Sequence, residues 1–214
     1  MNKEILLYVL TFMLLMSTLT SVSAIQLSPP VNYSTQVAGF PVERSMYVLA
    51  VAQENGKYVG TPSVLTVKVC RGSGVVYVSA MPLSEVDVQA SARMAALIAS
   101  YIAGTNYFSY DYFICIKANT TIVGGPSAGA AMTIALVAAL LNKPIDKSVV
   151  ITGMILPDGT IGAVGGIPEK LDAAVKVGAE IMLIPLGQRE SLSLSSGKYI
   201  DVVELGKNKG IKVI

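Results

Sequence analysis

The sequence predicts an α+β domain in which helices pack against a mixed sheet. Three observations favour this fold class: short β-branched runs follow one another irregularly, an apolar segment at 128–141 has helical length, and glycine- or proline-rich turns separate the segments. Such a mixed order of strands and helices is typical of a sheet with helices packed against it. At 214 residues the chain is long enough for one domain with a sizeable core.

The N-terminal segment predicts export. Lys3 precedes an apolar run over residues 5–16, and the small residues at 22–24 are typical of a signal-peptidase cleavage site. We expect residues 1–24 to be a signal peptide or, alternatively, an uncleaved signal anchor, because the uncharged stretch from 5 to 29 is long enough to span a bilayer. Either alternative makes the protein extracytoplasmic, whether secreted or anchored to the membrane through its N-terminus. Residues 25–45, rich in proline and serine, are interpreted as a linker before a domain at 46–214.

The first half of that domain is predicted to contain a sheet and one helix. We expect strands at 47–52, 63–69, 75–80 and 112–118, and the turn-forming residues 71–74 indicate that the second and third strands form a hairpin. Ser84-Glu85-Val86-Asp87 has the form of a capping box, which predicts a helix that ends at Gly104. The apolar positions that recur at helical spacing, and that we expect to face the sheet, are Val86, Ala90, Leu97 and Tyr101.

The second half is predicted to alternate helices and strands. The segment 128–141 is apolar on every face, which is typical of a helix buried in the core. A strand at 148–155, a tight turn at 157–160, a helix from Pro168 to Gly178 and a strand at 180–184 follow. We expect a short helix at 189–195, and the last residues resemble the middle of a strand, which predicts a truncated or unusual C-terminus.

The composition excludes several classes of chemistry. The sequence contains no histidine, so no Ser-His-Asp or Cys-His centre and no zinc site built on imidazole can form, and two cysteines are too few for a four-cysteine metal site. No G-x-x-x-x-G-K-[ST] segment is present, and a net charge of +2 gives no electrostatic reason to expect nucleic acid. We therefore expect no cofactor and no metal. Cys70 and Cys115 lie in β-like runs, and both a disulfide and two free thiols remain open.

The most informative stretch is Gly124-Gly125-Pro126-Ser127-Ala128-Gly129, which precedes the apolar helix. The glycines allow a sharp turn and a close approach to a ligand, and Pro126 suits the start of a helix. Ser127 would then lie at a helix N-terminus beside unpaired N–H groups, which is what an oxyanion requires. The alternative is that Ser127 merely caps a core helix.

A second stretch, Gly165-Gly166-Ile167-Pro168-Glu169-Lys170, places a lysine in the first turn of a helix. The helix dipole disfavours a cation there, so a lysine that must be neutral would suit the position better than a charged one. The alternative is a solvated lysine beside Glu169.

Together these motifs resemble the proteolytic domain of Lon proteases, peptidase family S16. The resemblance rests on G-P-S-A-G before an apolar helix, Thr152-Gly153 at a strand, G-G-I-P-E-K, and Ile181-Met182-Leu183-Ile184-Pro185, in this order and spacing. It implies a fold similar to domain 2 of ribosomal protein S5, with Ser127 as nucleophile and Lys170 as its partner. Gly124, Gly125 and Pro126 would support the oxyanion, and the Thr152 hydroxyl would orient the lysine.

The resemblance also contains departures. Bacterial Lon usually has Asp at the position of Gly124 and Glu at that of Met154, and we expect Met154 to make the surroundings of the lysine drier. The Lon ATPase module and the family's terminal helix are missing from this chain, which in this respect is similar to the ATPase-free Lon-like proteases of archaea. The resemblance thus implies an ATP-independent serine endopeptidase acting on unfolded, flexible or membrane-adjacent polypeptides.

Two other functions and the oligomeric state remain open. One is a catalytically silent Lon-like binding module of a membrane-associated complex. The other is a small-molecule kinase of the GHMP class, in which residues 124–131 would cradle phosphate. A homo-oligomer is compatible with the resemblance, but the ATPase modules help to assemble Lon rings, so we do not carry over their subunit number.

Overall fold

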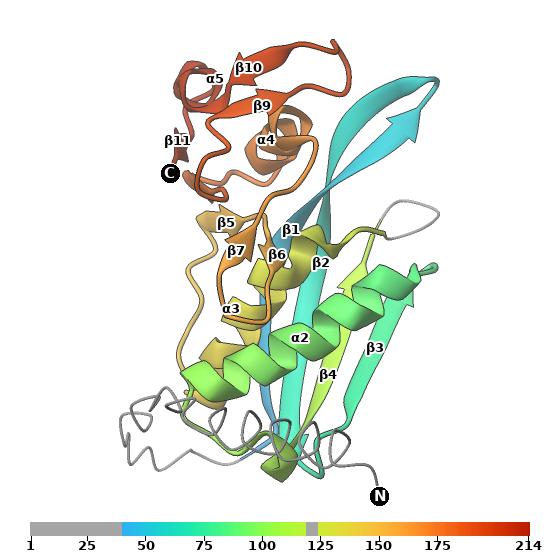
Figure 1. The fold of residues 1–214 in the computed structure, drawn as a ribbon, viewed down its shortest axis with the longest axis vertical. Helices are drawn as coiled ribbons and strands as arrows, with labels where there is room; N and C mark the ends of the chain where they lie inside the picture. Colours follow the sequence, from blue (N-terminus) through green and yellow to red (C-terminus); the bar gives the residue numbers. More distant parts are fainter. Residues whose placement is uncertain (1–39, 119–123) are drawn as a thin grey trace, which may run out of the picture. The chain divides into compact units, whose positions relative to one another are not determined.

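The computed structural model describes residues 40–118 and 124–214, and its largest sheet has four strands (Figure 1). These are β1 (Val42–Glu54), β2 (Lys57–Arg71), β4 (Tyr110–Lys117) and β3 (Val76–Met81), in the spatial order β1-β2-β4-β3. β1 and β4 both run antiparallel to β2, and β3 runs parallel to β4. Because β1 begins at Val42, residues 42–45, which we assigned to the linker, are part of the sheet. The predicted signal segment at 1–24 lies outside the described residues.

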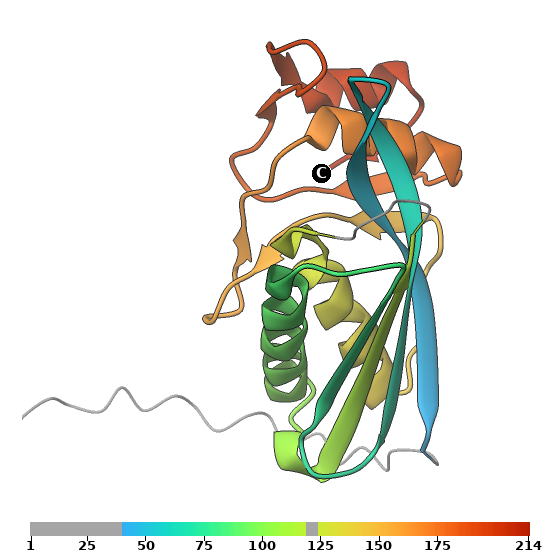
Figure 2. The same cartoon turned by 90° about the vertical axis from the view of Figure 1, so that its right-hand side faces the viewer.

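Two helices, α2 (Val86–Ile102) and α3 (Gly129–Leu140), cover one face of this sheet. Figure 2 shows both helices on the same side of the strands. Alternate residues of β4 point into the core beneath them, among them Tyr112, Ile114 and Ile116. Nearly every side chain of α3 is buried, as its apolar sequence predicted. The α+β fold class is therefore confirmed, with the main core between the sheet and these two helices.

The predicted hairpin between the second and third strands is wrong. β2 forms its hairpin with β1, and β4 lies between β2 and β3. The turn after β2 instead crosses the start of β4, where Asp111 accepts hydrogen bonds from Ser73 N–H at 2.8 Å and Val75 N–H at 2.9 Å. These backbone hydrogen bonds lower the pKa of Asp111. A tight turn can thus join strands that are not neighbours, because a later strand enters between them.

The helix at α2 was predicted correctly, but its buried face and its cap were not. Val86 is 82% exposed and Tyr101 is 59% exposed, so the apolar stripe that we expected against the sheet faces outward. The buried face consists mainly of small residues, which bring α2 close to the equally small residues of α3. The predicted capping box is also absent: the N-cap is Glu85, with no side-chain hydrogen bond to the helix end. Asp87, the expected box acid, accepts a hydrogen bond from Gly125 N–H instead.

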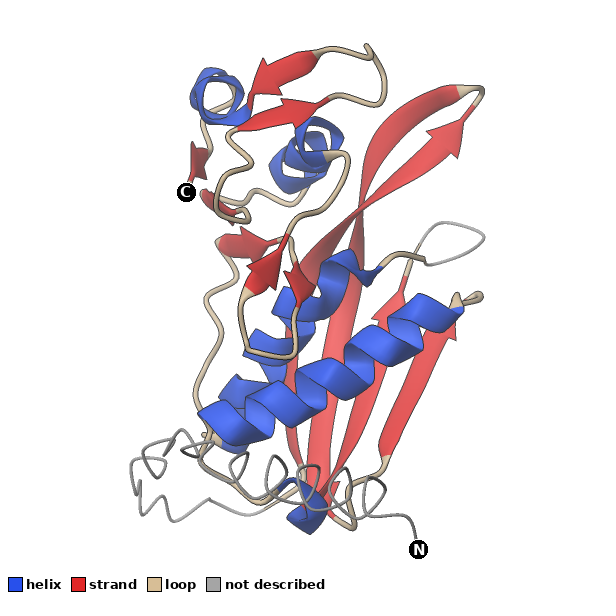
Figure 3. Ribbon diagram, in the orientation of Figure 1, coloured by secondary structure: helices blue, strands red, loops and turns tan. Residues whose placement is uncertain are grey.

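The second half of the chain forms a smaller layer around three parallel strands (Figure 3). β5 (Val149–Ile151), β8 (Ile181–Leu183) and β11 (Lys212–Val213) pair in the order β11-β8-β5. Helices α4 (Ile167–Lys176) and α5 (Val202–Asn208) contribute Ile167, Leu171 and Val202 to a second hydrophobic cluster with these strands. Short pairs β6 (Met154–Ile155) with β7 (Ile161–Gly162) and β9 (Glu190–Leu192) with β10 (Tyr199–Asp201) complete the chain.

Two further predictions in this half need correction. The strand expected at 148–155 is divided into β5 and β6 by Thr152 and Gly153. The short helix expected at 189–195 is wrong, because that segment forms β9 of a hairpin in which Ser191 and Ser193 are buried. The alternation in Ser-Leu-Ser-Leu-Ser has the two-residue period of a strand, and this pattern prevails over local helix signals.

Two open questions from the sequence concern the cysteines and the membrane. Cys70 and Cys115 are both free thiols: Cys70 pairs in register with Asp111, and Cys115 with Thr66, so they lie four positions apart along the sheet. No helix within 40–118 and 124–214 has the combination of length and apolar character that a bilayer span needs.

Candidate active site

Ser127 lies in a one-turn 3₁₀ helix, η2 (Pro126–Ala128), that leads directly into α3. Gly125 precedes it with φ +83°, a backbone conformation that favours glycine, and Pro126 starts the turn as predicted. At the first turn of a helix the N–H groups have no partner within the helix. Among the described residues no hydrogen bond from Ser127 N–H is found, so this group remains available to a ligand.

Lys170 lies in the first turn of α4, where its N–H donates to Gly166 C=O at 2.9 Å. Gly60 on β2 allows this helix to approach the sheet, because a Cβ at position 60 would overlap the carbonyl oxygen of Glu169. Gly166, the helix N-cap at φ +67°, faces Val51 and Leu194 at a distance that leaves no room for a side chain. Close backbone packing thus determines the position of the Lys170 backbone.

The ammonium group of Lys170 is buried without an acidic partner. The residue is 4% exposed, and no ion pair with it is found in the described part of the chain. Burial penalises the charged form and lowers the pKa of Lys170 to about 8. Near neutral pH a usable fraction of the amine is therefore unprotonated, as a general base requires.

The neighbouring Glu169 does not neutralise Lys170. Glu169 is buried as well, but its Oε1 accepts hydrogen bonds from Ser193 Oγ at 2.8 Å and Ser195 N–H at 3.0 Å. Burial alone would raise the pKa of Glu169, yet these hydrogen bonds outweigh it, and the pKa is lowered. The solvated Lys170–Glu169 pair that the sequence left open is therefore not what the structure contains.

Thr152 and Gly153 connect the serine turn to the lysine. Lys170 Nζ donates to Thr152 Oγ1 at 3.2 Å, and Thr152 Oγ1 donates to the Ser127 carbonyl at 3.5 Å. Gly153 N–H donates to the same carbonyl at 2.9 Å, and Gly153 C=O accepts from Ala130 N–H at 3.0 Å. The interruption of the strand between β5 and β6 therefore has a structural purpose, since it frees these groups to hold the turn that carries Ser127.

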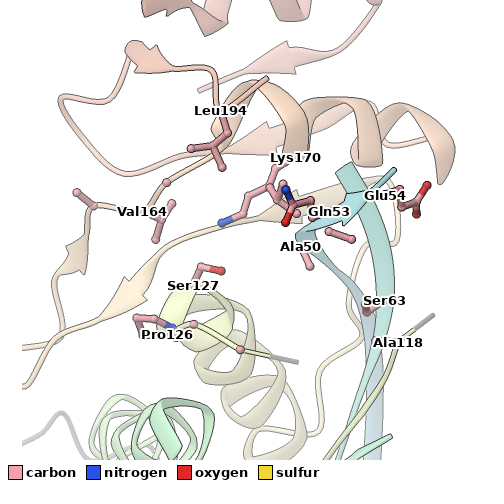
Figure 4. Close-up of a pocket in the computed structure, with 16 residues that line it drawn as sticks. Ala50, Gln53, Glu54, Ser63, Ala118, Pro126, Ser127, Val164, Lys170 and Leu194 are labelled. Carbon is pink, nitrogen blue, oxygen red and sulfur yellow. The ribbon is translucent and has the colours of Figure 1, made fainter. Parts of the chain in front are cut away.

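Ser127 and Lys170 face each other across one cavity of about 760 Å³ (Figure 4). Five consecutive β1 residues, 50–54, form one wall, and Val164 and Leu194 contribute apolar surface near the lysine. The predicted supporting residues Gly124, Gly125 and Pro126 also line the cavity, whereas Thr152 is buried and is not among the lining residues. The volume is in the range of ligand-binding pockets, and the site contains a hydroxyl, an amine of lowered pKa and a free backbone N–H group.

The structure corrects two expectations about the surroundings of the site. Gly125 N–H, expected among the oxyanion donors, donates to Asp87 Oδ2 at 3.0 Å. Met154, expected to dry the surroundings of Lys170, lies on β6 opposite Gly162 and is not among the described residues that line the cavity. Asp87 was missed by sequence reasoning because it is distant in the chain and its contact is with backbone, which leaves no motif.

The comparison with protein families agrees with this geometry. The model of the Lon protease (S16) C-terminal proteolytic domain matches residues 82–200, more than half of the chain, and this range includes both Ser127 and Lys170. The chain belongs to this family. At Gly124, the carboxylate of the exposed Glu85 occupies the space that a side chain on residue 124 would enter.

The curated relatives are longer proteins. An archaeal Lon protease of Methanothermobacter thermautotrophicus is 33% identical over 123 residues, which are 58% of this chain and 19% of that protein. A Lon protease of Buchnera aphidicola is 40% identical over 105 residues, 49% of this chain and 14% of the relative. A peroxisomal Lon protease homolog 2 of Eremothecium gossypii is 46% identical over 68 residues, 32% of this chain and 7% of the relative. The chain thus spans less than a fifth of each.

Proposed function

We propose that this chain is a serine endopeptidase that works with a Ser127–Lys170 dyad. The observation that carries the proposal is the position of the two side chains across one cavity, with the amine of Lys170 buried and free of any acidic partner among the described residues. Membership of the S16 family supports the same chemistry.

In the proposed reaction Ser127 Oγ attacks the scissile carbonyl while neutral Lys170 takes its proton. The developing oxyanion accepts a hydrogen bond from Ser127 N–H, the free donor in η2. Lys170 then protonates the leaving amine, and water hydrolyses the acyl-enzyme with the same lysine as base. The hydrogen bond to Thr152 fixes the position from which Lys170 Nζ acts.

We propose extended polypeptides as substrates. β1 is the outermost strand of its sheet, and residues 50–54 line the cavity, so an extended peptide can add to this edge by backbone hydrogen bonds. The 214 residues contain no P-loop segment, so we expect hydrolysis without ATP and a preference for unfolded, flexible or membrane-adjacent chains. Stable domains expose cleavable segments in only a small fraction of molecules. The apolar N-terminal sequence supports an exported, membrane-anchored or secreted enzyme.

The test is hydrolysis of casein by the full-length chain in detergent, without ATP. We expect Ser127→Ala and Lys170→Met to lower kcat at least about a hundredfold. Matched controls are Ser79→Ala and Lys212→Met, both exposed and away from the cavity, which should retain the parent rate. Retained hydrolysis in Ser127→Ala would exclude this nucleophile.

The pH dependence gives an independent check on the base. With the pKa of Lys170 near 8, the neutral form is scarce at low pH and predominates above that value. We expect kcat to rise about tenfold per pH unit below pH 8 and to level off above it. A profile that is flat from pH 6 to 9 would contradict the assignment of Lys170 as base.

A catalytically silent binding module is the second candidate. The observation in its favour is that Lys170 Nζ hydrogen-bonds to Thr152, and no hydrogen bond between Lys170 and Ser127 is found in the described residues. A folded parent chain that neither cleaves casein nor reacts with a fluorophosphonate probe would favour it. The small-molecule kinase alternative gains no support from the family match.

A further inference from the structure

The three residues that precede Ser127 are all contacted by side chains from the N-terminal end of α2. In the first turns of α2, the Glu85 carboxylate faces Gly124, Asp87 binds Gly125, and Ser91 Oγ donates to the Pro126 carbonyl at 3.3 Å. These helix residues lie about 35 to 40 positions before the turn that they contact. The turn that carries the proposed nucleophile is therefore supported from α2 as well as from Gly153.

Asp87 makes the shortest hydrogen bond of this group. Its Oδ2 accepts from Gly125 N–H at 3.0 Å, and a carboxylate acceptor strengthens such a bond relative to a neutral one. Its Oδ1 is buried, with no hydrogen-bond partner among the described residues. Gly125 has φ +83° and ψ 149°, a conformation that its own local sequence does not lock, because glycine is free to leave it. The fixed acceptor for its N–H is therefore what keeps the peptide group between Gly124 and Gly125 in place.

We propose that Asp87 is a positioning residue for the reaction of Ser127, an inference that rests on the proposed function. By holding Gly125 N–H, Asp87 fixes the peptide group between Gly124 and Gly125, directly before Pro126, and so orients η2. Ser127, with its hydroxyl and its free N–H, is then in place at the cavity before substrate arrives. Preorganised donors act on the transition state without a cost of reorientation.

The experiment compares Asp87→Ala with Asp87→Asn in the full-length chain. The asparagine oxygen can still accept from Gly125 N–H, whereas alanine leaves this N–H without a partner. We expect Asp87→Ala to lower kcat for a fluorogenic peptide roughly tenfold to a hundredfold with little change in KM, because misplaced groups raise the barrier rather than weaken binding. Asp87→Asn should restore kcat to within about threefold of the parent. Gln89→Ala, exposed on the same helix, is the matched control.

A second measurement does not depend on activity. In ¹⁵N-labelled protein, the Gly125 amide should exchange faster with water in Asp87→Ala than in the parent, and Asp87→Asn should retain slow exchange. This readout separates loss of the hydrogen bond from a general loss of fold, which would accelerate exchange across α3 as well.

Each outcome decides the inference. A fall in kcat with faster Gly125 exchange, rescued in both respects by Asp87→Asn, supports it. A parent that cleaves while Asp87→Ala keeps or exceeds its kcat overturns it, since Asp87 would then be idle or would withhold Gly125 N–H from the oxyanion. An equal loss in Asp87→Asn and Asp87→Ala also overturns it, because charge rather than position would be the cause. A parent as inactive as Ser127→Ala refutes the proposed function and the positioning role with it.

Discussion

The two halves of the candidate site are held in different ways. The Ser127 half depends on backbone contacts: the Ser127 carbonyl accepts from Gly153 N–H and Thr152 Oγ1, and the residues before it contact α2. Ser127 itself is only partly buried. The geometry of this half is therefore sensitive to hydrogen bonds and to the space around a few glycines.

The Lys170 half depends on burial instead. Lys170 is 4% exposed in the smaller hydrophobic layer and is brought there by the close packing of α4 on β2. Within the described residues its side chain makes one hydrogen bond, to Thr152. Its lowered pKa is a consequence of removing water rather than of a neighbouring charge. The comparison teaches that one half can be perturbed by changing single acceptors, whereas the other responds to changes in packing and pH.

The strongest way to break the lysine half is to separate α4 from the sheet. Gly60→Ala places a methyl group on the carbonyl oxygen of Glu169, and backbone cannot move aside as a flexible side chain can. We expect a loss of about 3 kcal/mol in the free energy of unfolding and a large loss of kcat. Chemical denaturation measures the first, and Gly165→Ala is the control for stability, since nothing lies within 4 Å of a Cβ there. Equal stability of the two variants would show that α4 is not held by this contact.

The lysine half also predicts a variant that gains stability while losing activity. Burial holds the pKa of Lys170 near 8 against an ordinary value of 10.5, so below pH 8 the folded state must bury a charge that the unfolded state keeps in water. Lys170→Met removes this penalty, and we expect it to stabilise the fold at pH 7 by up to about 3 kcal/mol. Between pH 8 and pH 10.5 this penalty disappears and the free energy of unfolding of the parent rises, because only its unfolded state still binds the proton.

Urea titrations of the parent and Lys170→Met at pH 7 and pH 10 test this. The difference in unfolding free energy should shrink as the pH rises. A variant that is less stable than the parent at both pH values would mean that Lys170 is solvated, and the role of burial in the lysine half would be wrong.

The sequence predicted the apolar parts of the fold well and the parts decided by tertiary contacts less well. The buried helix α3 and the helix α4 between Pro168 and Gly178 were predicted because composition and turn residues define them locally. The neighbours of β3 were not, because a later strand, β4, enters between β2 and β3. The outward direction of Tyr101 was not, because α2 buries small residues, whose contribution to an apolar pattern is weak beside that of larger, exposed side chains.

The same division applies to the site. Ser127 and Lys170 were predicted from motifs, and the structure brings them to one cavity, where their catalytic roles stay a prediction. The contacts that hold them were mostly not predictable: Asp87 reaches a backbone N–H, Glu169 binds the β9–β10 hairpin, and Gly60 contacts a helix more than a hundred residues later. Each of these contacts joins distant segments through a backbone group or a close approach. Such contacts leave no motif with a characteristic spacing in the sequence.

Thr152 links the two halves, and its replacement predicts the smallest effect. Thr152→Val keeps the shape of the side chain but removes the hydroxyl that accepts from Lys170 Nζ and donates to the Ser127 carbonyl. A neutral hydrogen bond contributes about 1 kcal/mol, so we expect kcat to fall about fivefold. Thr152→Ser should retain kcat, because the hydroxyl remains.

The pH profile of Thr152→Val sharpens the comparison between the halves. If burial alone sets the pKa of Lys170, the midpoint should stay near pH 8 while the plateau of kcat falls. A midpoint that shifts by a full unit would show that the hydroxyl, rather than the apolar surroundings, tunes the lysine, and the two halves would then be coupled through chemistry as well as through geometry.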